Sequence, residues 1–295
     1  MNENQIVKKL SRVGILGNVL LSAFKLFAGI AGRSGAMVSD AVHSLSDVFA
    51  TLIAFVGVKL SQKNADKAHP YGHERFESVA SLILGLILAG TGLGIGWTGV
   101  SKLISGNVSD IAVPTFLPLI AAAVSIAVKE GMYWYTMHYA KVLDSAAFKA
   151  DAWHHRSDAF SSIGSFLGIG AAKLGLPIMD PIASVVICLF ILKVAFDITR
   201  GALRQMLDTS CSADFEQKME EYITRQPGVE HVDLLRTRQF GNKIYVDVEL
   251  SVAPDISLRD AHDISEETHR AVEREYPNVK HVMIHVNPGD DHDVG

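Results

Sequence analysis

The chain has 295 residues, of which 48% are hydrophobic and 20% charged, and its formal net charge is −5. So apolar a chain has ample surface to bury, which excludes intrinsic disorder, and a mildly acidic chain offers no overall attraction for nucleic acid. Two cysteines, Cys188 and Cys211, are too few for a disulfide framework or an all-cysteine zinc site.

Six long apolar segments occupy the first two thirds of the chain. They cover residues 10–31, 36–60, 78–102, 112–137, 146–172 and 179–199. Each has about 20–27 residues, which is enough at 1.5 Å per residue to cross a ~30 Å hydrocarbon core. A large soluble helical bundle is the alternative, but it would need far more polar covering than the chain supplies. We therefore predict an α-helical membrane protein with a six-transmembrane-helix bundle over residues 1–204.

Lys and Arg residues in the short loops indicate how the bundle is oriented. One side of the membrane holds ten of them: Lys8, Lys9, Arg12, Lys63, Lys67, Arg75, Lys141, Lys149, Arg200 and Arg204. The other side holds only Arg33, Lys102 and Lys173. Because cytoplasmic loops carry the excess of Lys and Arg, both termini are predicted to be cytoplasmic.

The composition changes after about residue 205. Residues 1–204 hold 18 Lys and Arg against 13 Asp and Glu, whereas residues 205–295 hold 9 against 19. Sequence periodicity and turn residues predict helices at 212–226 and 257–276 and strands at 230–239, 243–252 and 279–286, with a hairpin at Gly241-Asn242. These elements predict a small, acidic cytoplasmic α+β domain (αββαβ) at 205–290, followed by a flexible tail at 291–295.

The second apolar segment carries polar residues where a membrane span should have none. Asp40, His43 and Asp47 lie among apolar residues, and at about 100° per residue they share a helical face roughly 60° wide. An ionised carboxylate near the bilayer centre is costly unless a cation or a water-filled cavity compensates for it. A functional site on this face is therefore predicted.

The fifth segment shows the same pattern of polar residues among apolar ones, at Asp151, His154 and Asp158. His43 and Asp47, like His154 and Asp158, are i, i+4 pairs, so each helix offers two neighbouring ligands. Two His and two Asp from two helices would form a closed four-coordinate site that suits Zn²⁺. The alternative is a packing network in which these side chains only hydrogen-bond one another. Asp40 and Asp151 are predicted to support the ligands or to line the way into the site.

A second cluster lies between the second and third spans, in the run NADKAHPYGHERFES. Asp66, His69 and His73 follow one another at spacings of three and four, and Pro70 and Gly72 interrupt any helix there. A loop should therefore present them. They could bind a cation, or the histidines could simply be solvated.

Other residues are noted without an assigned function. The third span carries six glycines: Gly85, Gly90, Gly92, Gly94, Gly96 and Gly99. Small residues at four-residue spacing let membrane helices approach closely. The alternative is that glycine is simply common in such helices. Asn18, Lys25, Lys129 and Glu130 lie in or near apolar spans. Lys129 and Glu130 are adjacent, so they are expected to have separate partners or to snorkel.

The runs SDAVHSLSD, HPYGHERFES and HHRSD resemble those of the cation diffusion facilitator family of divalent-metal transporters, and the likeness covers nearly the whole chain. The resemblance implies a homodimer with a metallochaperone-like cytoplasmic domain. It implies a transport site in each protomer at His43, Asp47, His154 and Asp158, and a loop site at Asp66, His69 and His73. Within the family, a transport site of two His and two Asp goes with zinc and cadmium.

The same resemblance implies metal binding at the dimer interface of the cytoplasmic domain, by Asp233, Glu249, His262 and His285. Some relatives have His where this chain has Asp233 and Glu249, and Asp where it has Asn287. Arg75 and Asp208 match a basic–acidic pair that joins the membrane and cytoplasmic parts in relatives.

These features lead to one functional hypothesis: proton-coupled efflux of Zn²⁺, or Cd²⁺, from the cytoplasm by alternating access, with protons as the counter-ion. Metal ligation needs neutral imidazole, so protons and metal compete for the His ligands. Transport of Fe²⁺, Co²⁺ or Mn²⁺ is the first alternative, and a membrane-anchored metal sensor or assembly scaffold is the second. No enzyme is expected, since HExxH is absent. The predicted location is a bacterial inner membrane.

Overall fold

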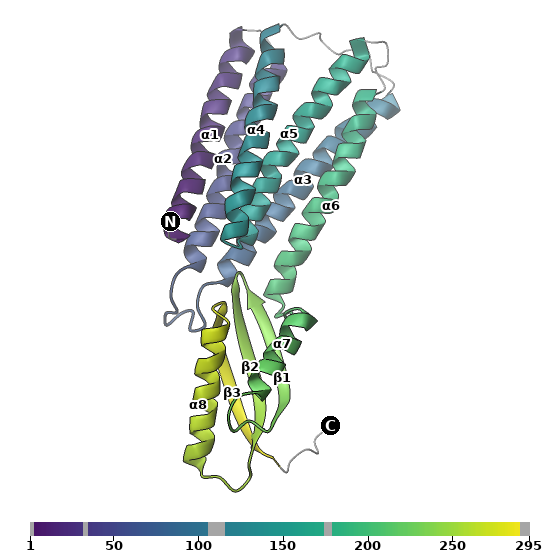
Figure 1. Ribbon diagram of the computed structural model, residues 1–295. Helices are drawn as coiled ribbons and strands as arrows, with labels where there is room; N and C mark the ends of the chain where they lie inside the picture. The colour runs from purple at the N-terminus through teal and green to yellow at the C-terminus, as the bar shows by residue number, and fades with distance from the viewer. Residues whose placement is uncertain (1–2, 32–34, 106–115, 174–178, 290–295) are drawn as a thin grey trace. The chain divides into compact units, whose positions relative to one another are not determined.

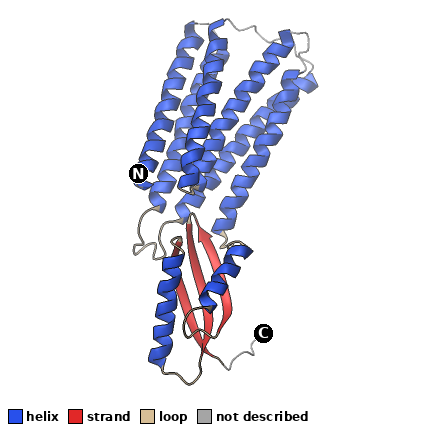
Figure 2. Cartoon of the chain, viewed as in Figure 1, coloured by secondary structure: helices blue, strands red, loops and turns tan. Residues whose placement is uncertain are grey.

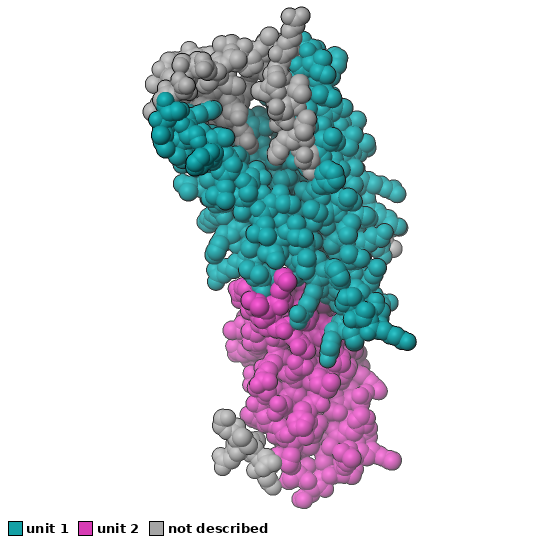
Figure 3. Space-filling view, turned by 180° about the vertical axis from the view of Figure 1, so that it is seen from behind, with its two compact units in different colours: residues 1–203 teal, residues 204–295 magenta. Residues whose placement is uncertain are grey.

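The computed structural model describes residues 3–31, 35–105, 116–173 and 179–289, so the predicted tail at 291–295 lies outside the described residues. Two compact units make up the chain, Met1–Leu203 and Arg204–Gly295; Figure 3 colours them separately. Each unit has its own buried core.

Six long helices build the first unit. They are α1 (Glu3–Ala31), α2 (Gly35–Ser61), α3 (Arg75–Ser105), α4 (Phe116–Val142), α5 (Ala146–Lys173) and α6 (Met179–Met206). Successive helices alternate in direction along the bundle (Figure 1). The six predicted helices are confirmed, and they extend beyond the apolar segments. For example, α1 begins at Glu3, because helical hydrogen bonding continues into polar residues such as Lys8.

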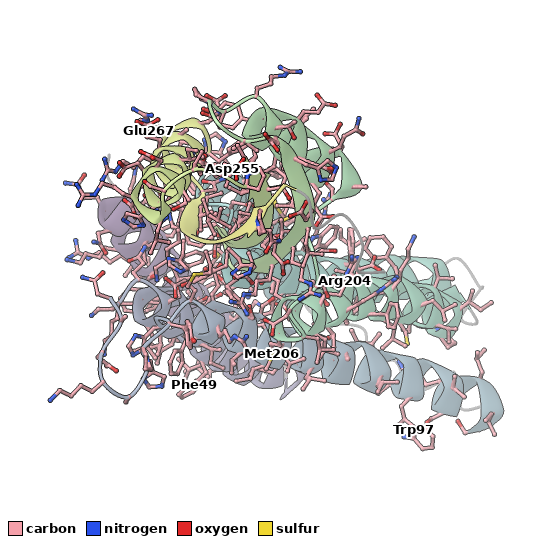
Figure 4. All side chains as sticks on the ribbon, turned by 90° about the horizontal axis from the view of Figure 1, so that it is seen from below. Phe49, Trp97, Arg204, Met206, Asp255 and Glu267 are labelled. Carbon is pink, nitrogen blue, oxygen red and sulfur yellow. The ribbon has the colours of Figure 1, made fainter. Side chains whose placement is uncertain are left out.

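Large apolar side chains cover the outside of the bundle, and its interior holds polar side chains among apolar ones. Phe49 and Trp97 are 66% and 74% exposed, and both project from its outer surface (Figure 4). The buried polar residues include Asn18, Lys25, Asp47, Lys129, Asp151, His154, His155 and Asp158. An apolar outer surface is unlike that of a soluble protein and fits a bundle surrounded by lipid. Within the described ranges, α1 and α3 are long and apolar enough to span a membrane on composition alone, with mean hydropathies of 1.8 and 2.0.

Glycines let α3 approach α6 closely. A Cβ atom added at Gly96 would lie 2.5 Å from Cys188 Sγ, and one at Gly99 would lie 2.9 Å from the Pro181 carbonyl oxygen. In contrast, a Cβ atom at Gly94 would meet nothing within 4 Å. The close-approach interpretation therefore holds for one face of α3, which carries Gly85, Gly92, Gly96 and Gly99, and not for Gly90 and Gly94.

The second unit combines two helices with a three-stranded sheet (Figure 2). Its elements are α7 (Ala213–Thr224), β1 (His231–Phe240), β2 (Lys243–Val252), α8 (Leu258–Glu275) and β3 (Val279–Pro288). The strand order is β1-β2-β3, with β1 antiparallel and β3 parallel to the central β2. The predicted αββαβ fold is confirmed.

Local signals explain where these elements begin and turn. The side chains of Ser212 and Ser257 cap α7 and α8 by accepting hydrogen bonds from backbone N–H groups of the first turn. Gly241 turns the β1–β2 hairpin with a φ of +57°, a region that favours glycine. Met219 of α7 and Val272 of α8 are fully buried in the core on the sheet.

Candidate metal centre

A cluster of polar side chains lies near the middle of the helix bundle. Asp47 of α2 and Asp158 of α5 each lie about 18 Å along their helices, which are about 40 Å long. Ligand atoms of Asp47, His154 and Asp158 all lie within 4.8 Å of one another. His154 Nε2 is 3.3 Å from Asp47 Oδ1, and the three side chains are 7% exposed or less.

The structure thus brings together three of the four residues predicted for the transport site. The fourth, His43, belongs to α2 one helical turn before Asp47. The side chains of His43 and Asp40 lie outside the described part of the structure. Their participation therefore stays a prediction.

Lys129 of α4 is a member of this cluster that the sequence did not predict. Its Nζ atom is 2.5 Å from Asp47 Oδ2 and 2.9 Å from Asp158 Oδ2. It also donates a 2.9 Å hydrogen bond to Asn18 Oδ1 of α1. The side chain is 1% exposed. One ammonium group therefore bridges the carboxylates of two different helices, and four helices meet at this point.

The neighbouring residue Glu130 faces another partner. Its Oε1 atom is 3.2 Å from Arg156 Nη2 of α5, and the Arg156 guanidinium lies 4.2 Å from the centre of the Tyr133 ring. The expectation that Lys129 and Glu130 have separate partners is confirmed. This pair joins α4 to α5.

Asp151 lies in a separate buried contact. It accepts a hydrogen bond from Thr51 Oγ1 of α2 at 3.1 Å, and its Oδ2 atom is 3.7 Å from His155 Nε2. All three side chains are buried. Asp151 therefore joins α2 to α5. Its predicted role in supporting the metal ligands, or in lining the way into the site, stays a prediction.

The predicted loop cluster also assembles between α2 and α3. Ligand atoms of Asp66, His69 and His73 lie within 4.8 Å of one another. Asp66 Oδ2 is 3.4 Å from His73 Nε2, while His73 Nδ1 is 3.1 Å from the Asn64 carbonyl oxygen. A carbonyl only accepts, so Nδ1 is the donor in this contact, and Nε2 is the ring nitrogen that faces Asp66.

Backbone geometry keeps the Asp66 carboxylate charged. Its Oδ1 atom accepts hydrogen bonds from the backbone N–H groups of His69 and Ala68. These bonds hold the pKa of the Asp66 carboxyl below its usual value. The turn is made by Gly72, whose φ is +102°. The loop thus holds a carboxylate and two imidazoles in an arrangement that suits a divalent cation.

The four predicted ligands of the cytoplasmic unit are not gathered into one cluster. In the part of the chain that the structure describes, no three of Asp233, Glu249, His262 and His285 bring ligand atoms within 4.8 Å of one another. Glu249 and His285 are register partners on β2 and β3, while His262 is exposed on α8. A site that uses all four would need a second copy of the chain, which stays a prediction.

Asp233 has hydrogen-bond partners within its own sheet. Its carboxylate accepts bonds from Ser251 Oγ at 2.8 Å and from Asn287 Nδ2 at 2.9 Å. Burial acts to raise the pKa of Asp233, but the hydrogen bonds from Asn287 and Ser251 outweigh it and hold the pKa below its usual value. Asn287 therefore serves as a hydrogen-bond donor to Asp233.

The predicted pair of Arg75 and Asp208 spans the two units. Arg75 begins α3, and Asp208 follows α6 with a φ of +54°. Because the two residues belong to separately described units, their pairing stays a prediction.

Comparison with known proteins agrees with this architecture. Residues 11–207 match the family described as "Cation efflux transmembrane domain". Residues 211–289 match the ZT_dimer family, described as "Cation efflux protein, cytoplasmic domain", and this match indicates dimerisation.

Three relatives extend over most of the chain. Metal tolerance protein 2 of Oryza sativa is 34% identical over 95% of this chain and 78% of its own length. The manganese efflux system protein MneP of Bacillus subtilis is 30% identical over 96% of this chain and 97% of its own length. Magnetosome protein MamB of a Magnetospira species is 31% identical, with 92% of each chain covered. The chain therefore belongs to the cation efflux family and is a divalent-cation efflux transporter, not an enzyme, with a helical transmembrane domain and a cytoplasmic domain.

Proposed function

We infer that the protein exports Zn²⁺, and by the same chemistry Cd²⁺, from the cytoplasm. The observation that carries this inference is the buried cluster of Asp47, His154 and Asp158 halfway along the bundle. His43, one turn from Asp47, would complete a set of two imidazoles and two carboxylates. Such a set suits tetrahedral Zn²⁺, which has no geometric preference of its own from d electrons.

Manganese is the strongest competing substrate, because a manganese efflux system protein is among the relatives. Carboxylate oxygens suit Mn²⁺, whereas imidazole nitrogen favours Zn²⁺. Because two of the four proposed ligands are imidazoles, the ligand set favours Zn²⁺ over Mn²⁺ as the transported ion. A transport assay that offers several metals at one pH gradient would decide between them.

Coupling to protons follows from the ligand chemistry. A metal ion binds neutral imidazole, so a proton and a metal ion exclude each other at His43 or His154. Metal would bind from the cytoplasm, and the helices would rock to open the site outward. A proton from the outer side would then expel the ion and return to the cytoplasm with the empty carrier. The result is antiport of protons and metal by alternating access.

The other two predicted sites would serve this cycle. The loop cluster of Asp66, His69 and His73 would collect metal on the cytoplasmic side. Binding of metal between the cytoplasmic domains of a homodimer would draw two protomers together and stimulate transport. A bacterial inner membrane remains the proposed location, with both termini in the cytoplasm.

The central test replaces one carboxylate of the cluster. Asp158→Ala should abolish zinc-driven proton flux in proteoliposomes, because the site loses a ligand and a negative charge. Asp214→Ala is the matched control, since Asp214 is exposed on α7 and pairs with Lys218; its flux should stay at the wild-type level. A wild-type rate in Asp158→Ala would refute the assignment of the site. Metal binding by the wild type without any flux would favour a sensor or scaffold instead.

A further inference from the structure

We propose that Lys129 is a tethered cation that occupies the metal position of the empty transport site and must be displaced when metal binds. The proposal rests on the function proposed above, because it assumes that Asp47 and Asp158 are metal ligands. It adds a residue from α4 that sets the affinity of the site for metal.

The first support is the position of the ammonium group. Lys129 Nζ lies 2.5 Å from an oxygen of Asp47 and 2.9 Å from an oxygen of Asp158. Zinc–oxygen bonds measure about 2.0–2.2 Å. An ion bound between these two oxygens would therefore lie within the volume that the ammonium now fills. The two cations exclude each other by size and by charge.

The second support is the burial of the cluster. Lys129, Asp47 and Asp158 are 1%, 2% and 7% exposed. Two carboxylates that face each other in such a place repel one another and lack water, so an empty site without a cation would be strongly destabilised. The Lys129 ammonium supplies that cation whenever metal is absent.

Asn18 can keep a hydrogen bond to the ammonium group after that group has left the carboxylates. Its Oδ1 atom, on α1, accepts a hydrogen bond from Lys129 Nζ at 2.9 Å. This oxygen belongs to none of the predicted metal ligands. Because the lysine side chain is long and flexible, Nζ can keep its bond to Asn18 while the carboxylates turn to an incoming ion.

The exchange has a quantitative consequence. Metal binds only to the fraction of molecules in which the ammonium has left the carboxylates, so the apparent dissociation constant equals the intrinsic one divided by that fraction. Where one molecule in ten is open, removal of the ammonium should tighten metal binding by about tenfold. The same competition should speed metal release, because the ammonium replaces the departing ion.

The test uses the full-length protein in detergent with Zn²⁺ as the probe. Lys129→Met removes the charge and keeps much of the volume, and Lys129→Gln is a second variant in case the first does not fold. Zinc affinity is measured by equilibrium dialysis. Either variant should bind Zn²⁺ about tenfold more tightly than the wild type. In proteoliposomes the KM for zinc should fall and the maximal rate should fall with it.

Thermal unfolding with and without zinc separates this role from a purely structural one. Loss of the tethered cation should destabilise the empty protein and leave the zinc-bound protein near wild type, so the zinc-induced rise in Tm should grow. If Lys129 formed only a structural ion pair, its loss would lower the Tm of the empty protein and of the zinc-bound protein by the same amount. Lys25→Met is the matched control: Lys25 is also buried on an inner helix face, and it donates to Ser44 Oγ. Its zinc affinity should stay within about twofold of the wild type.

Each outcome decides one question. Unchanged or weaker zinc binding in both Lys129 variants would overturn the proposal, and so would an unchanged zinc-induced shift in Tm. Asp158→Ala tests the proposed site itself. If it loses zinc binding in the same assay, the site stands, even where the Lys129 variants overturn the role proposed for Lys129. If Asp158→Ala binds zinc like the wild type, the proposed function itself falls.

Discussion

The contact between α3 and α6 permits a prediction with an internal control on the same helix. Gly96→Ala should destabilise the membrane domain, whereas Gly94→Ala should not. An added Cβ at Gly96 would lie 2.5 Å from Cys188 Sγ and 3.1 Å from Cys188 Cβ, and an added Cβ at Gly94 would meet nothing within 4 Å. The two substitutions are chemically identical and lie on different faces of α3.

The magnitude follows from the size of the overlap. Normal contacts between heavy atoms fall at about 3.5–4.0 Å, so Cys188 Sγ would have to retreat by about 1 Å. Overpacking of this kind costs about 1–3 kcal/mol. Without a clash, Gly→Ala in a helix gains about 0.5–1 kcal/mol in unfolding free energy. Both variants share this gain, so they should differ in unfolding free energy by the overpacking cost alone, about 1–3 kcal/mol.

The assay is thermal unfolding of the full-length protein in one detergent, followed by circular dichroism at one scan rate. Gly96→Ala should unfold several degrees below Gly94→Ala. Addition of Cys188→Ala removes the Sγ atom, so the double variant should recover part of the loss and reveal coupling between the two positions. If Gly96→Ala were as stable as Gly94→Ala, the close approach of α3 to α6 would be wrong.

Two further predictions concern the loop and the cytoplasmic domain. Asp66→Asn should raise the apparent KM for zinc uptake about tenfold, or ~1.4 kcal/mol, with little change in maximal rate, because the transport site is intact; an unchanged KM would remove the loop from the metal path. The pKa of Asp233 is lowered in the fold, so its carboxylate stabilises the domain above the unfolded pKa, and this stabilisation disappears as the pH falls through the lower folded pKa, below about pH 4. Asn287→Ala should reduce that pH dependence, as measured by urea unfolding of residues 204–295 at pH 7 and pH 3; an identical pH dependence would contradict the role of Asn287.

The elements of the cytoplasmic domain were predictable because their signals are local. Ser212 and Ser257 stand directly before the helices that they cap, and Gly241 stands at the turn between two alternating strands. The pairing of His and Asp proposed as ligands on α5 was predictable for the same reason. The spacing of His154 and Asp158 places both on one face of a single helix, whatever surrounds it.

Contacts between helices were less accessible to sequence reasoning. The sequence did mark Lys129 as unusual, because a charged side chain in the middle of an apolar span costs free energy unless it has a partner. Its partners nevertheless lie on three other helices, and Asn18 is 111 residues away. Only the packing of α4 against α1 and α5 decides that Lys129 faces inward to the carboxylates. For the glycines of α3, too, the sequence could not say which of them face α6.

A carrier has to be stable both with and without its cargo, and this requirement would explain a lysine in the proposed metal site. Two carboxylates suit a doubly charged ion, but in a buried site they oppose folding once that ion leaves. An ammonium group held at 2.5 and 2.9 Å from them reduces the charge of the empty site from −2 to −1. The remaining negative charge still attracts an incoming divalent ion. A lysine is therefore a suitable internal competitor, because it is strong enough to stabilise the empty carrier and carries less charge than the ion that replaces it.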